Sequence, residues 1–119
     1  MAKRSSFYLP IPKGVAAAAR DGLFLVVEGH AGRGLTRDAV SRAQVLAGRQ
    51  GNGEISRTTL RMMRNWFRRH HVDRRPSWKA RKTPGWVAWQ IWGGNAGWRW
   101  AERAAPPSER WTLPAWARV

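Results

Sequence analysis

Hydrophobic positions in the first half of the chain recur with helical spacing. Within residues 13–27, Val15, Ala19 and Leu23 lie four apart, on one face of a helix, and an alanine-rich run favours helix formation. Residues 23–27 could equally form a short buried strand, because five apolar residues do not distinguish the two structures. The pattern therefore predicts a first helix over residues 13–27, of which residues 23–27 form either its last turn or a short strand.

Two further helices are predicted to follow residues that commonly cap helix N-termini. Thr36 precedes a segment, ending at about Gly48, in which alanine, valine and leucine fall on one face. Ser56 precedes the clearest helix of the chain, residues 57–71. One face of this helix is apolar and consists of Leu60, Met63 and Phe67, with Trp66 beside it.

The second half of the chain contains a ladder of tryptophans. Thr83 followed by Pro84 is typical of a helix start, since threonine caps the helix and proline is tolerated at the first helical position. The predicted helix carries Trp86, Trp89 and Trp92 at positions i, i+3 and i+6 and ends at two glycines. This spacing is typical of core side chains, so we expect Trp89 and Trp92 to be buried structural residues.

Asn95 is the predicted N-cap of a last helix, which ends at about residue 104. Together these elements predict an all-α fold: a compact bundle of four to five short helices. Residues 13–104 form the single helical domain, residues 1–12 an extended N-terminal arm, and residues 105–119 an extended C-terminal tail rich in tryptophan and proline. Glycine-rich turns join the helices.

The charge balance narrows the function classes. The chain has 119 residues, with 22 Lys and Arg against 7 Asp and Glu, for a net charge of +15. Such an excess disfavours a compact chain by self-repulsion, so a polyanionic partner is expected. The absence of cysteine excludes a disulfide scaffold, a cysteine-ligated zinc site, an iron–sulfur site and a thiol nucleophile. No apolar run is long enough to span a bilayer, and glycine and proline breaks leave no long basic amphipathic helix for its surface, so we expect no membrane partner.

The densest group of charges lies in residues 57–82, where ten basic residues face one acid, Asp73. Four of the arginines repeat at i, i+4, i+7 and i+11, which predicts an arginine stripe along one helix face without acidic residues. Guanidinium groups bind phosphate oxygens in bidentate fashion, so this block is the predicted nucleic-acid contact. Its predicted residues are Arg57, Arg61, Arg64, Arg68, Arg69, Arg74, Arg75, Lys79, Arg81 and Lys82, together with Trp78.

Tryptophans outside the ladder of Trp86, Trp89 and Trp92 are expected to contact a partner or to fasten the tail. Trp78 stands among basic residues and is predicted to stack on an unpaired base or sugar. Trp111 and Trp116 lie in the proline-rich tail and are expected to fasten it to the domain or to a partner. Asparagine and glutamine are scarce near the arginine stripe, so no base specificity is predicted.

The sequence shows no arrangement of side chains that suits metal binding or catalysis. His70 and His71 are adjacent and point about 100° apart on a helix, so they do not easily bind one ion. We expect His70 and Asp73 to play a structural role at the helix end, and no metal or other cofactor. Residues 29–34 are rich in glycine but match no nucleotide-binding motif. If they do bind a phosphate, Arg33 and the following helix N-terminus would hold it.

The chain resembles a family of small proteins encoded by tailed bacteriophages. The family pattern begins with Pro-x-Gly-Val-x-x-Ala-Ala-x-x-Gly-Leu, continues with Phe-x-Arg-His-x-Val-Asp and closes with Ala-Trp-x-x-Trp-Gly-Gly-Asp-x-Gly. Gly-Arg-Gly, Arg-Ala and Arg-Met follow the opening motif in the pattern. Here the whole pattern corresponds to residues 12–23, 32–34, 42–43, 61–62, 67–73 and 85–101. The chain departs from it at His71, where an acid is usual, and at Asn95, where aspartate is usual. The resemblance implies a phage origin and no settled activity.

These features predict a basic, phage-encoded protein that binds nucleic acid, with DNA favoured, by its phosphates. Two alternatives stay open. One is a virion protein, a head decoration or interior component that faces packaged DNA or an acidic coat protein. The other is a host-takeover factor that binds an acidic host protein. The expected location is the host cytoplasm or the phage virion. An enzyme is not expected, because the few acids form no matched pair for acid–base catalysis.

Overall fold

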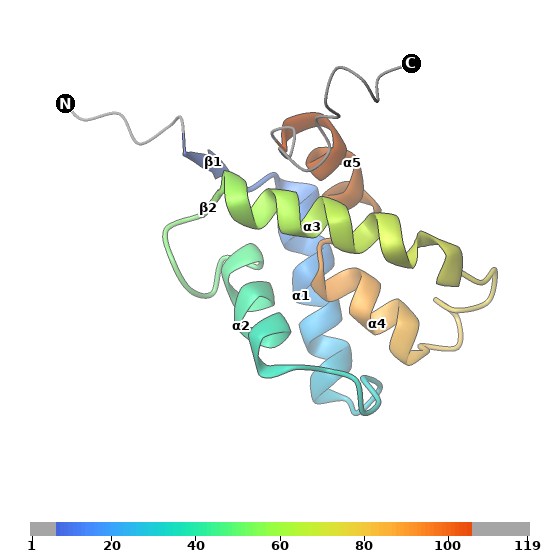
Figure 1. Cartoon of the computed structure of the whole chain (residues 1–119). Helices are drawn as coiled ribbons and strands as arrows, with labels where there is room; N and C mark the ends of the chain where they lie inside the picture. The colour runs from blue at the N-terminus through green and yellow to red at the C-terminus, as the bar shows by residue number, and fades with distance from the viewer. Residues whose placement is uncertain (1–6, 106–119) are drawn as a thin grey trace, which may run out of the picture.

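The described part of the chain, residues 7–105 of a computed structural model, is built from helices at the segments that spacing and capping residues predict (Figure 1). Residues 23–27 continue the first helix, in which Leu23 and Leu25 are buried in the core while Phe24 and Val27 are exposed. The all-α class is confirmed. The elements are α1 (Lys13–Val27), α2 (Arg37–Leu46), α3 (Arg57–His70), α4 (Pro84–Ile91), α5 (Gly94–Ala104), the 3-10 helix η1 (His71–Asp73) and two short strands.

Three of the four predicted N-caps are confirmed. The hydroxyl oxygens of Thr36, Ser56 and Thr83 each accept a hydrogen bond from the backbone N–H three residues later, at 3.1, 3.1 and 3.2 Å. The fourth prediction, Asn95, is wrong. Gly93 and Gly94, with φ of 115° and 66°, turn the chain sharply, so the N-cap is Gly93 and α5 begins two residues earlier than predicted.

Tyr8–Pro10 (β1) and Glu54–Ser56 (β2) form a two-stranded antiparallel sheet, in which Leu9 lies opposite Ile55. The extended conformation expected for the N-terminal arm is therefore found at residues 8–10, but its pairing with β2 was not predicted. The rest of the arm, residues 1–6, lies outside the described residues, as does the tail from residue 106, with Trp111 and Trp116.

Helix α1 lies at the centre of the fold and packs against α2, α4 and α5, while α3 packs against α5 (Figure 1). The core is formed by the apolar faces of all five helices. Trp89 is 1% exposed, which confirms its predicted burial, whereas Trp92 is only partly buried. Among residues 7–105 no helix is long and apolar enough to cross a membrane.

Candidate nucleic-acid interface

Part of the arginine stripe on α3 lies against protein. Arg64 is 5% exposed, and the Nε atom of Arg61 is also buried. The predicted stripe therefore does not present all four of its guanidinium groups to a partner. Arg64 follows Leu60 by four residues and precedes Phe67 by three, so on a helix it lies beside the apolar stripe. Helix α5 covers this side of α3, and Arg57 Nη1 donates a hydrogen bond to the carbonyl oxygen of Ala104 at 3.4 Å.

Arg68 forms an ion pair with an acid from α5. Its Nε and Nη2 atoms donate hydrogen bonds to the two carboxylate oxygens of Glu102, at 2.8 and 2.7 Å. Trp98 Nε1 donates a third, at 3.2 Å. The hydrogen bonds from Arg68, together with its charge, lower the pKa of Glu102, and the same contact raises the pKa of Arg68. The acid stands 34 residues away in the chain, so the local charge pattern could not reveal the pair.

This ion pair predicts a pH-dependent contribution to stability. The folded-state pKa of Glu102 is lowered, so the pair stabilises the fold above the unfolded carboxyl pKa of about 4.3, and this contribution is lost as the pH falls through the folded-state value. Both side chains are partly exposed, so we expect Glu102→Gln to cost less than about 1 kcal/mol at neutral pH. Thermal melting should show the difference shrinking toward about pH 3. A difference that is constant with pH would contradict this assignment.

A dense group of exposed cations lies at the end of α3 and in the loop that follows it. Residues 69–82, here called the basic loop, carry six exposed basic side chains: Arg69, Arg74, Arg75, Lys79, Arg81 and Lys82. The only acid among them, Asp73, lies 3.1 Å from His70 Nδ1 through its Oδ2 atom. This contact agrees with the structural role predicted for His70 and Asp73. The basic loop thus presents a strongly positive surface.

Hydrogen bonds and ring contacts hold the basic loop in place. Arg74 Nε donates to the His71 carbonyl at 3.1 Å, and Arg75 Nη1 donates to the Val72 carbonyl at 3.1 Å. The guanidinium of Arg74 also lies over the rings of Trp89 and Trp98, 5.6 and 5.3 Å from their centroids. Such cation–π contacts orient the side chain without removing its charge.

Trp78 belongs to the aromatic cluster beneath the loop. It is partly buried, and its ring centroid lies 5.6 Å from that of Trp86 and 5.4 Å from that of Trp89. Lys79 lies over Trp86 at 5.8 Å. Trp78 therefore uses part of its ring surface to anchor the loop, and its stacking on a base stays a prediction.

Asn95 also has a structural role, though not the predicted one. Its Oδ1 atom accepts a hydrogen bond from Trp89 Nε1 at 2.9 Å. A buried indole N–H needs such a partner, because an unsatisfied polar group in a core is costly. The amide oxygen of Asn95 therefore satisfies the indole N–H of Trp89.

A column of stacked side chains was not foreseen from the sequence. The guanidinium of Arg42 lies 4.3 Å above the ring of Trp92, which stacks on Trp66 at 4.7 Å with an angle of 8° between planes. The other neighbour of Trp66 is the His70 ring, at 4.5 Å. Burial lowers the pKa of Arg42, and the charge of Asp38 opposes this effect. The only sequence signal was Trp66 beside the apolar stripe of α3.

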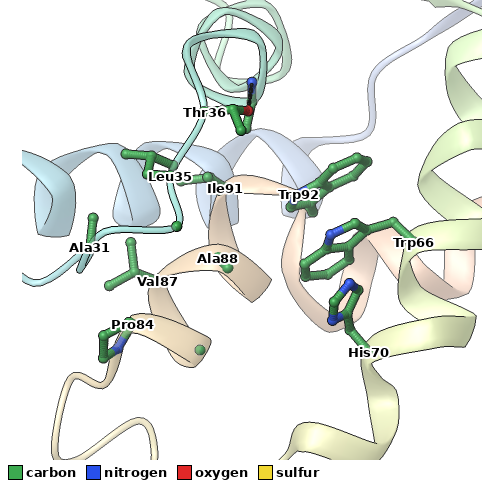
Figure 2. Close-up of a pocket in the computed structure, with 13 residues that line it drawn as sticks. Ala31, Leu35, Thr36, Trp66, His70, Pro84, Val87, Ala88, Ile91 and Trp92 are labelled. Atoms are coloured by element: carbon green, nitrogen blue, oxygen red, sulfur yellow. Dashed lines mark hydrogen bonds between the residues drawn. The ribbon is translucent and has the colours of Figure 1, made fainter.

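A cavity of about 440 Å³ opens next to this column (Figure 2). It lies between the segment before α2, the exposed side of α4 and the end of α3. Its lining is mostly apolar and consists of Ala31, Gly34, Leu35, Thr36, Ala39, Trp66, His70, Pro84, Gly85, Val87, Ala88, Ile91 and Trp92.

Comparison of the chain with protein-family models, with curated proteins and with solved structures returned no match. Within residues 7–105, no group of three or more histidines, aspartates and glutamates is placed to hold a metal ion.

Proposed function

We propose that this protein binds nucleic acid, with DNA favoured, by contacting the phosphate backbone through the basic loop. The observation that carries the proposal is the six exposed basic side chains of residues 69–82, whose one acidic neighbour, Asp73, is already paired with His70. Phosphate contacts of this kind supply affinity and position but no sequence information.

The structure changes which residues are proposed for the contact. Arg64 is buried, Arg61 is partly buried, and Arg68 forms an ion pair with Glu102. These three arginines therefore contribute little to a phosphate-binding surface. Arg69 and the cations after it are exposed. Their loop is held by hydrogen bonds and by tryptophan contacts, so ordering its backbone on binding costs little entropy.

The binding experiment measures affinity for duplex DNA as a function of salt concentration. Four to six phosphate contacts predict a linear plot of log affinity against log salt, with a slope between about −3 and −6. The triple variant Arg69→Gln, Lys79→Gln and Arg81→Gln should bind more weakly, with a slope less steep by up to about 2.7, or about 0.9 for each lost contact.

A matched control removes the same charge elsewhere. Arg49, Arg99 and Arg103 are exposed and lie outside the basic loop, and their joint replacement by glutamine also removes three charges. We expect this control to retain the slope of the original protein. If it weakens binding as much as the loop variant does, bulk charge explains the affinity and the basic loop is not a dedicated surface. No binding at low salt would remove the proposal and leave an acidic coat or host protein as the partner to test.

A further inference from the structure

The cavity beside the aromatic column has a shape and lining suited to a small flat ligand. Its floor consists of apolar side chains from α4 and from the segment before α2, among them Leu35, Val87, Ala88 and Ile91. One wall is formed by Trp66, His70 and Trp92, which project toward the cavity in Figure 2. Cavities of this volume that combine apolar walls with a few polar groups are typical ligand sites.

The wall carries two polar groups, one on Trp66 and one on His70. In Figure 2 the indole nitrogen of Trp66 lies on the side of its ring toward Ala88, and within residues 7–105 this N–H makes no hydrogen bond. His70 Nδ1 lies 3.1 Å from the Asp73 carboxylate, so Nδ1 is the ring nitrogen that donates to this acid and Nε2 is the one left to accept a hydrogen bond. The wall thus offers one donor and one acceptor, which suits the edge of a nucleobase.

The stacking geometry limits how a base could enter. Both faces of the Trp66 ring are covered, one by Trp92 and the other by His70, and Arg42 covers the second face of Trp92. A base therefore cannot be sandwiched between Trp66 and Trp92. It would lie on the apolar floor with its polar edge against the wall.

Three exposed arginines stand next in the chain to residues that line the cavity. They are Arg33, Arg37 and Arg69, which adjoin Gly34, Thr36 and His70. Two acids lie near: Asp73, which is paired with His70, and Asp38, which lies one turn before Arg42 on α2. The excess of arginine around an apolar cavity favours a ligand that combines a flat ring with phosphate.

We propose that the cavity receives one unpaired nucleobase of a single strand, whose phosphates lie on the basic loop and on the arginines that adjoin the lining residues. This inference rests on the proposed function and deepens it, because it adds recognition of an unpaired base to backbone contact. An apolar side chain of a partner protein is the competing occupant.

The test compares a single strand of about ten nucleotides of mixed sequence with an abasic strand of the same length, which has the same phosphates and no bases. We expect the protein to bind the strand with bases about fivefold or more tightly. Ala88→Leu, which fills the cavity without changing charge, should abolish this preference and leave affinity for the abasic strand unchanged. Ala17→Leu, an exposed change on α1, is the matched control and should keep the preference.

A second variant guards against a folding defect in Ala88→Leu. Trp66→Phe keeps an aromatic ring in the column, but the ring is smaller and has no N–H donor. This variant should therefore reduce the preference while circular dichroism stays unchanged. Equal binding of the two strands by the unchanged protein would overturn the cavity inference and leave the proposed function standing. If neither strand nor duplex DNA binds, the proposed function itself fails. If the base preference persists in both cavity variants, the cavity is not the base site, and an apolar peptide becomes the occupant to test.

Discussion

Replacement of Trp89 by alanine should lower the free energy of unfolding by about 3–5 kcal/mol. The indole is 1% exposed and lies at the centre of the aromatic cluster, 4.8 Å from Phe67, 5.4 Å from Trp78 and 5.6 Å from Trp98 between ring centroids. Alanine would leave a large cavity there and remove the hydrogen bond to Asn95. A loss of this size is a large part of the stability of a domain this small.

Urea unfolding followed by far-ultraviolet circular dichroism measures this loss. Phe24→Ala is the control, because Phe24 is also aromatic but is 59% exposed on α1, and its replacement should change stability by less than about 0.5 kcal/mol. Unchanged unfolding of Trp89→Ala would show that the tryptophan cluster is not the structural centre of the domain. The contact of Arg74 with the Trp89 ring would then not be what holds the basic loop in place.

Local signals account for the parts of the fold that were predicted correctly. A hydroxyl side chain that accepts from the backbone N–H three residues later, as at Thr36, Ser56 and Thr83, marks a helix start that the sequence shows. The predicted start of α5 was wrong because the true start depends on the left-handed backbone of Gly93. Many residue types can follow such a turn. The pairing of β1 with β2 joins segments more than 40 residues apart, and three-residue strands leave no periodic signal.

The candidate site was predicted in part, for a related reason. The basic loop is visible in the sequence because its charges are contiguous, and a loop exposes them whatever the helices do. The arginine stripe was misjudged because periodicity shows which side chains share a face, not what covers that face. Glu102 and the backbone of α5 cover it here, and only the tertiary fold brings them to Arg68 and Arg57.

The cavity could not be predicted at all. Its walls come from three separate segments, around Leu35, Trp66 and Val87, and none of these residues belongs to a ligand-binding motif. Its existence depends on how α4 lies across α1, since α4 supplies much of the floor (Figure 2). The position of α4 is therefore the structural feature on which the base-binding inference depends most.

Gly22 sets that position, and its replacement by alanine should destabilise the protein by about 1–3 kcal/mol. A Cβ atom on Gly22 would lie 2.7 Å from both Cγ2 and the backbone nitrogen of Ile91, so α1 and α4 would have to move apart. Intrinsic helix propensity predicts the opposite sign, because alanine in the middle of a helix is favoured over glycine by about 1 kcal/mol.

Gly85→Ala is the matched control, since it is also a helical glycine to alanine change. A Cβ atom at Gly85 meets its nearest neighbour, Trp78, at an ordinary 3.6 Å, so this variant should be neutral or up to about 1 kcal/mol more stable. Chemical unfolding of both variants decides between contact and propensity. If Gly22→Ala is more stable than the original protein, α4 does not lie against α1 as closely as described. The floor formed by Val87, Ala88 and Ile91 would then shift, and the cavity proposed for a nucleobase would lose its shape.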